Sequence, residues 1–271
     1  MGGGHLRPFG FTPTRIIGAV ALFWILGAAF KQDKIERKDM FLLALCGLFG
    51  VAVNQLLFFK GLDLTTPINA AIIMTINPVL VLILSAILLK EAINIVKIIG
   101  VLCGLFGAFL LITQGDLANI SIMDSSTSLG NLFVLINATS YALYLIIAKP
   151  LMNKYNPLTV IKWVFTFGFI YVIPFGWPEF QSAEWGSFGI DIWWRIAFVV
   201  IGTTFLAYLL NIFALKELPP SIVSTYIYLQ PLLAGIFAIL LGSDRINGLM
   251  IGSGLLIFIG VYLVSNPFRK A

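Results

Sequence analysis

The chain is built from long apolar stretches that are separated by short polar breaks. The stretches are continuously apolar and do not alternate with polar residues, which indicates helices rather than the strands of a membrane barrel. Their lengths are close to the ~17–25 residues that a helix needs to cross a bilayer. We therefore expect nine transmembrane helices. They are placed at residues 11–30, 40–59, 67–89, 95–113, 129–148, 157–177, 192–213, 219–241 and 246–264.

The composition agrees with a membrane environment. Hydrophobic residues make up 59% of the chain and charged residues 11%, whereas an ordinary soluble domain has roughly 25% charged residues. Such a chain cannot cover its surface with hydrated groups, so its outer surface must face lipid. The polar breaks, such as 31–39 and 90–94, are too short to hold a soluble domain. The predicted fold class is an all-α integral membrane protein, a helical bundle in a lipid bilayer.

The basic residues lie mostly at one set of alternate helix ends. Twelve of the 17 Lys and Arg residues fall on the side that includes the C-terminus, among them Lys31, Lys90 and Lys149. Lys and Arg accumulate in cytoplasmic loops, so we expect a multi-pass protein of the cell membrane, a bacterial inner membrane, with a cytoplasmic C-terminus. Because this pattern accounts for the net charge of +5, no nucleic-acid partner is expected.

The chain contains an internal repeat. When it is shifted over itself by 153 residues, a set of unlike residues falls into register: Pro67 on Pro220, Asn77-Pro78 on Gln230-Pro231, Glu91 on Asp244, Ile93-Asn94 on Ile246-Asn247 and Gly107 on Gly260. The second copy has five helices, and an odd number of crossings places two copies in opposite orientations. Inverted repeats of this kind are typical of secondary transporters, whose substrate site lies near the midplane between the halves.

The two predicted halves are residues 1–127, with four helices, and residues 128–271, with five. Phe11-Thr12-Pro13 aligns with Tyr155-Asn156-Pro157, so the partner of the helix at 129–148 would precede residue 1. We therefore expect a five-plus-five inverted repeat whose first helix is missing from this chain. Duplication for packing alone is the alternative reading of the repeat.

Two segments carry a resemblance to a known family. They are TTPINAAIIMTINPVLVLILSAILLKE at 65–91 and PPSIVSTYIYLQPLLAGIFAILLGSDR at 219–245. In each, Pro and small residues open a helix that contains a polar-Pro pair and ends on an acid. In this plan the sequence resembles the EamA family of the drug/metabolite transporter superfamily over essentially its whole length. The resemblance implies export or exchange of metabolites, often amino acids, and a first helix that helps to line the cavity.

Polar residues deep in the predicted helices form the candidate substrate site. Facing lipid would cost such groups on the order of a few kcal/mol each, so they should face the bundle interior. Several follow a helical spacing that places them on one face, as at positions 137, 140, 141 and 144. The candidates are Asn54, Gln55, Asn69, Asn77, Asn137, Ser140, Tyr141, Tyr144, Tyr208, Asn211, Ser224, Tyr228 and Gln230. Amides and hydroxyls suit polar groups of a substrate, and tyrosine rings suit its apolar parts.

Each of these residues has a structural alternative. Hydrogen bonds between helices are worth about 0.6 kcal/mol on average in membrane bundles, and such bonds would also explain the polar stripes. Asn77 and Gln230 precede prolines, so either side chain can instead satisfy a backbone carbonyl that has lost its N–H partner. That arrangement would make the two positions hinges rather than ligand contacts.

The charged residues limit the mechanism. All 12 acidic residues fall in predicted loops or at helix ends, which favours facilitated diffusion or exchange over proton coupling through a carboxylate within the membrane. Arg15 and Lys162 lie about one turn inside predicted helices. We expect both to extend their side chains to the interface, with contact to an anionic substrate as the alternative.

The sequence thus predicts a secondary transporter of small metabolites, with amino acids as the first candidates, that works by alternating access. A membrane scaffold or receptor-like protein is the first alternative. An intramembrane enzyme is the second, although the predicted helices offer no interior acid or histidine for catalysis. No cofactor or metal is expected. Faces of small residues are compatible with a homodimer as well as with packing inside one copy.

Overall fold

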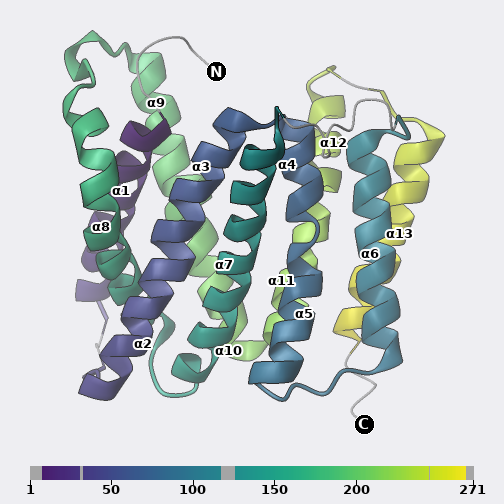
Figure 1. Ribbon diagram of the computed structural model, residues 1–271, viewed down its shortest axis with the longest axis horizontal. Coiled ribbons are helices and arrows are strands. Elements are labelled where there is room, and N and C mark those ends of the chain that lie inside the picture. Colours follow the sequence, from purple (N-terminus) through teal and green to yellow (C-terminus); the bar gives the residue numbers. More distant parts are fainter. Residues whose placement is uncertain (1–7, 31–32, 117–125, 244, 267–271) are drawn as a thin grey trace.

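The computed structural model describes residues 8–30, 33–116, 126–243 and 245–266, and over these ranges every regular element is helical. Figure 1 shows the helices side by side in one bundle. The elements are α1 (Pro8–Ala28), α2 (Arg37–Gly47), η1 (Leu48–Val53), α3 (Asn54–Leu64), α4 (Pro67–Met74), α5 (Asn77–Leu88), α6 (Ile95–Thr113), α7 (Ser128–Met152), α8 (Pro157–Gln181), η2 (Trp185–Ser187), α9 (Ile190–Phe198), η3 (Val199–Leu206), α10 (Ala207–Glu217), α11 (Pro220–Thr225), η4 (Tyr226–Tyr228), α12 (Leu229–Leu240) and α13 (Gly248–Ser265).

The predicted fold class is confirmed. The described residues contain nine helical stretches that are long and apolar enough to cross a membrane, and each overlaps one predicted span. The fourth stretch, Ile95–Thr113, has the predicted bounds, while the second and seventh extend further, over Arg37–Leu64 and Ile190–Glu217. The sequence underestimated these two because charged residues occupy their end turns.

Local chemistry explains where several helices begin. The side chains of Thr66, Asn94, Asn156 and Asn247 each accept a hydrogen bond from a backbone N–H two or three residues further on, and so cap the helix that follows. Four helices also start with a proline, which needs no N–H partner at the first helical position. These are α1, α4, α8 and α11.

Four of the spans are not continuous α-helices. A π-helical segment, η1, joins α2 to α3, and a second, η3, joins α9 to α10. One span breaks between α4 and α5, directly before Asn77-Pro78, and another passes through the short 3₁₀ segment η4 shortly before Gln230-Pro231. The π-helical segments are not predictable from the sequence, because no residue type there breaks an α-helix.

The interruptions follow the repeat. A shift of 153 residues carries η1 into η3 and the helix cap Asn94 onto the helix cap Asn247. The π-helical segments thus agree with the repeat at positions whose residues do not match, and the matched Asn94 and Asn247 share one capping role. The pair Glu91 and Asp244 is not compared, because Asp244 lies outside the described residues. The inverted relation of the halves and their boundary at 127/128 stay predictions.

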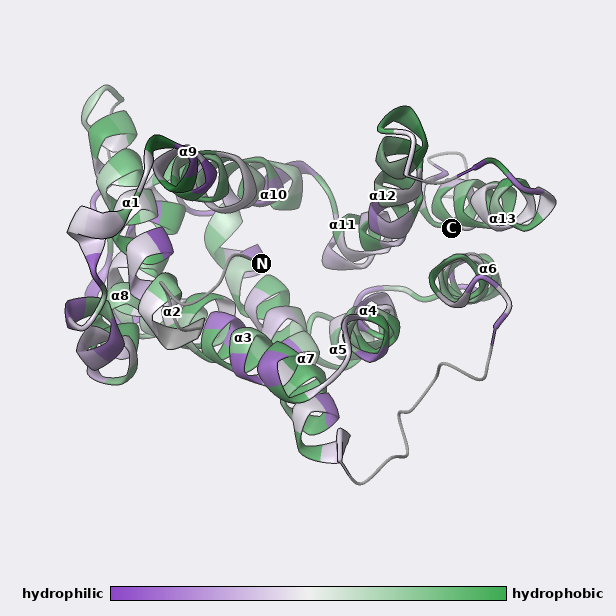
Figure 2. Ribbon diagram, turned by 90° about the horizontal axis from the view of Figure 1, so that it is seen from above, coloured by the Kyte–Doolittle hydropathy of each residue, from purple (hydrophilic) through white to green (hydrophobic). Residues whose placement is uncertain are grey.

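Helices from the two predicted halves pack against each other in pairs. Figure 2 shows α6 beside α13 at one edge of the bundle and α1 near α8 at the other, and α3 packs on α7 between them. The larger core contains Phe23, Tyr144 and Phe165. A smaller core around Tyr228 lies near the α6–α13 pair. The halves are therefore interleaved and share one bundle.

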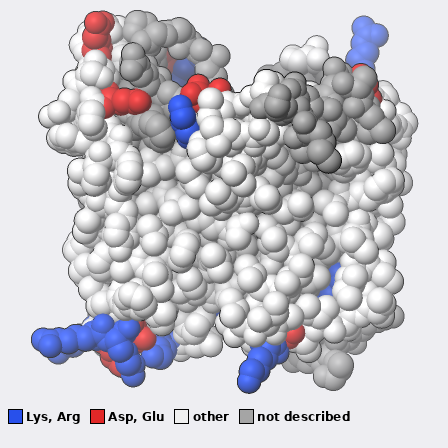
Figure 3. Space-filling model, in the orientation of Figure 1, with Lys and Arg blue, Asp and Glu red and all other residues white. Residues whose placement is uncertain are grey.

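Charged groups lie at the ends of the spans. Figure 3 shows Lys and Arg gathered at the lower end of the bundle and several acidic residues at the upper end. At the lower end the buried Asp39 carboxylate pairs with Lys154 at 3.0 Å and accepts a hydrogen bond from Tyr155 at 2.7 Å. At the other end Glu179 accepts a bond from the Gly10 N–H. Within the described residues no Asp or Glu lies in the middle of a span, as the sequence indicates.

Candidate functional site

A cluster of polar side chains lies where α7 meets the π-helical segment η1. Asn137 donates to the Asn54 carbonyl oxygen at 2.5 Å, and Ser140 donates to the Phe49 carbonyl oxygen at 2.6 Å. Both side chains are almost fully buried. The Phe49 carbonyl belongs to η1 and the Asn54 carbonyl follows directly after it, and a π-helical segment of this kind is often found at functional sites. We call this group and the α10 residues described next the central cluster.

Helix α10 completes the central cluster from the other side. The Tyr208 hydroxyl donates to the Gly50 carbonyl oxygen at 3.0 Å, with Asn54 Oδ1 as a second acceptor at 3.3 Å. Asn211, one turn further along α10, donates to the Tyr141 hydroxyl at 2.8 Å. The central cluster thus joins η1 and α3 of the first predicted half to α7 and α10 of the second.

Several polar atoms of the cluster have no hydrogen-bond partner in the described part of the chain. Neither polar atom of the Gln55 amide makes a hydrogen bond of good geometry with a described residue, although this residue is only 4% exposed. The same holds for Asn137 Oδ1, Asn211 Oδ1 and the Tyr144 hydroxyl. Buried polar groups are normally paired, so this concentration of unpaired atoms marks a place suited to a polar ligand or to water.

The remaining sequence-predicted residues lie outside the central cluster. Asn69 is near the start of α4, where its backbone N–H bonds Thr66. Asn77 donates to the Ala138 carbonyl oxygen of α7 at 2.8 Å, so its bond crosses to another helix rather than repairing its own. Ser224 bonds within α11 to the Ser221 carbonyl. Tyr228 is fully buried in the smaller core, and Gln230 is exposed. Their roles in substrate binding stay predictions.

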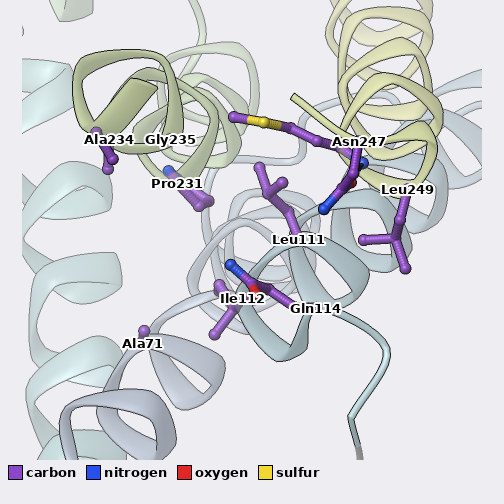
Figure 4. A pocket seen from close by; sticks show the side chains of 11 residues that line it. Ala71, Leu111, Ile112, Gln114, Pro231, Ala234, Gly235, Asn247 and Leu249 are labelled. Carbon is purple, nitrogen blue, oxygen red and sulfur yellow. Dashed lines mark hydrogen bonds between the residues drawn. The ribbon is translucent and has the colours of Figure 1, made fainter. Parts of the chain in front are cut away.

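A cavity among the described residues lies elsewhere. It has a volume of about 350 Å³ and lies between α4, α6, α12 and α13, with Gln114 and Asn247 as its polar side chains (Figure 4). The rest of its lining is apolar and comes from Ala71, Leu111, Ile112, Pro231, Ala234, Gly235, Ala238, Leu249 and Met250. None of the 13 sequence-predicted site residues lines this cavity. We take the central cluster as the candidate substrate site, because polar groups of several helices converge there.

Arg15 and Lys162 do not extend to the interface as expected. Arg15 Nε donates to the hydroxyl of Thr204, a fully buried residue of η3, at 3.0 Å. Lys162 is 7% exposed, and its amine lies 4.5 Å from the centre of the Trp24 ring. The expectation was wrong because it considered each helix alone, whereas neighbouring helices offer acceptors and aromatic faces inside the bundle.

The bond from Ser140 to η1 gives a test of the cluster's structural role. Ser140→Ala should lower the free energy of unfolding by about 0.6 kcal/mol, the average for hydrogen bonds between membrane helices. Thr139→Val is the matched control, because the exposed Thr139 hydroxyl bonds only the Leu135 carbonyl of its own helix. Reversible unfolding in mixed micelles measures both. Equal losses in the two variants would contradict the assignment.

Proteins that are similar to this chain in sequence are named as transporters. A transporter from Bacillus subtilis, YyaM, is 28% identical over 245 residues, which cover 90% of this chain and 79% of that protein. A transporter from Archaeoglobus fulgidus is 29% identical over 262 residues, covering 96% and 89%. A crystal structure that is 18% identical shares the fold, with a TM-score of 0.78 over 99% of this chain and 91% of its own.

The bundle of membrane-spanning helices and these relatives define the class: this is a multi-pass membrane transporter. The chain belongs to the EamA-like transporter family, whose model matches residues 2–113 and 128–266. This confirms the family resemblance that was based on the segments at 65–91 and 219–245. Membership of the drug/metabolite transporter superfamily follows from it.

Proposed function

We propose that the chain is a secondary transporter of small metabolites that works by alternating access between its two halves, with the central cluster as its substrate site. The observation that carries the proposal is that side chains of both predicted halves converge there. Tyr208 of α10 reaches Gly50 in η1, and Asn137 of α7 reaches Asn54 in α3. A site shared in this way changes shape whenever the halves move relative to each other.

The chemistry of the cluster favours amino acids as first candidates. Amides such as Gln55 and Asn211 can bind polar groups at one end of a zwitterion, and the rings of Tyr141 and Tyr144, 5.9 Å apart, can pack on an apolar side chain. Transport by export or exchange without a proton is favoured, because none of the acidic residues that the structure describes lies in the middle of a span, where proton carriers place such groups. The basic ends support a cytoplasmic C-terminus in the cell membrane.

Uptake of labelled amino acids into proteoliposomes tests the proposal. Vesicles preloaded with the unlabelled compound should accumulate label faster than empty vesicles, because exchange needs no net driving force. Binding without flux would favour the receptor-like alternative. An uptake rate that follows an imposed pH gradient at fixed membrane potential would show proton coupling and contradict that part of the proposal.

A further inference from the structure

A positive charge lies inside the bundle beside the central cluster, and no acidic residue in the described ranges pairs with it. Arg15 is half-buried in α1, seven residues after the first residue of that helix. Of its guanidinium nitrogens, only Nε makes a hydrogen bond to a described residue, the one to Thr204. None of the ion pairs among the described residues includes Arg15. An arginine stays charged at any physiological pH, so this site holds one uncompensated positive charge.

The surroundings of Arg15 are built from three helices. Its guanidinium carbon lies 5.1 Å from the centre of the Phe59 ring on α3 and 5.9 Å from that of Phe11 on its own helix. Rings at these distances hold a guanidinium by cation–π attraction. Thr204 fixes the third side, because its hydroxyl also bonds the Val199 carbonyl in η3 at 2.9 Å. The side chain is thus held in place, while the N–H groups of its two Nη atoms make no hydrogen bond to a described residue.

The same position adjoins the unpaired groups of the central cluster. Gln55 lies one turn before Phe59 on α3, and Tyr208 lies one turn after Thr204. Because Thr204 and Phe59 hold the Arg15 guanidinium, Tyr208 and Gln55 each lie one helical turn from a residue that contacts it. A guanidinium with free donors and a buried unpaired amide therefore face one region of the bundle.

We propose that Arg15 is the anchor for the carboxylate of the transported substrate, with the Gln55 amide as a second polar contact. A guanidinium fork matches a planar carboxylate through two parallel hydrogen bonds. The site has one positive charge, which matches one carboxylate, whereas a phosphate monoester carries about −1.5 to −2 charges at neutral pH. The inference rests on the proposed transport function and adds a requirement for a carboxylate.

Three related compounds separate the contributions of the substrate's groups: L-leucine, 4-methylpentanoate, which lacks the amine, and 3-methylbutylamine, which lacks the carboxylate. We expect leucine and the acid, but not the amine, to raise the melting temperature of the wild-type protein in phosphatidylcholine nanodiscs. Stabilisation by the amine equal to that by leucine would overturn the inference. So would a lack of response to leucine, 4-methylpentanoate and the other carboxylates of a wider amino-acid panel.

Variants test the residue itself. Arg15→Gln should raise the dissociation constant of leucine at least about tenfold. Arg15→Lys should recover part of the loss, because an ammonium keeps the charge but not the fork. Arg195→Gln is the matched control, since Arg195 is exposed on α9, and should bind as the wild type does. Unchanged affinity in Arg15→Gln would overturn the inference. Should that variant not fold, the comparison of the three compounds on the wild type decides.

Measurements of flux show whether the inference about Arg15 has failed or the proposed transport function has failed. Transport of leucine and of 3-methylbutylamine at equal rates would leave the transporter intact and remove the carboxylate requirement. If binding depends on the carboxylate but no compound is transported, Arg15 remains the carboxylate anchor and the transport function is contradicted.

Discussion

Replacing Gly260 by alanine should lower the melting temperature of the purified protein by several degrees. A methyl group at this position of α13 would lie 2.6 Å from the Gly100 carbonyl oxygen and 2.6 Å from the Gly104 backbone nitrogen of α6. Both contacts are with backbone, so the two helices must move apart. Overpacking of this kind costs about 1–3 kcal/mol, and small residues are what allow membrane helices to approach closely.

Gly252→Ala is the matched control for this substitution. It adds the same methyl group to the same helix, but, apart from that helix's own backbone and chain neighbours, no atom of a described residue lies within 4 Å of the new atom. Thermal unfolding of both variants in one detergent compares the steric effect directly. The control should melt at the wild-type temperature or above it. Equal melting temperatures for the two variants would contradict the packing of α6 on α13.

Removing the Tyr208 hydroxyl should reduce transport more than it reduces stability. In Tyr208→Phe, α10 loses its bond to the Gly50 carbonyl in η1 and its contact with Asn54. Leaving buried acceptors unpaired costs about 1–3 kcal/mol, which corresponds to roughly 5–150-fold in the transport rate if the cost falls on the working conformation. The ring remains, so its packing against Phe165, 4.9 Å between centres, is kept.

Exchange of labelled substrate, normalised to folded protein, measures this effect. Tyr262→Phe serves as the control, because Tyr262 is 64% exposed on the outer face of α13, and it should transport at the wild-type rate. If Tyr208→Phe also exchanges substrate at the wild-type rate, the central cluster is a structural junction only. The cavity between α4, α6, α12 and α13 would then be the next candidate for the substrate site.

The sequence predicted the helices well but not how their polar residues pair. Asn137 and Ser140 share one face of a helix by spacing alone, and the structure buries that face. Their partners are backbone carbonyls of η1 and of the first residue of α3, and no side-chain pattern marks those positions. Arg15 shows the same limit, because its acceptor lies 189 residues away on a segment that reads as plain apolar helix.

What the sequence determined by itself is the membrane environment, the nine spans and the repeat. Each of these depends on composition or on spacing along the chain, because the cost of placing polar groups in lipid acts on every segment separately. The tertiary structure decided which polar groups meet and where helices depart from α geometry. These depend on contacts between segments far apart in the sequence, such as the hydrogen bonds that η1 carbonyls accept from Ser140 of α7 and Tyr208 of α10.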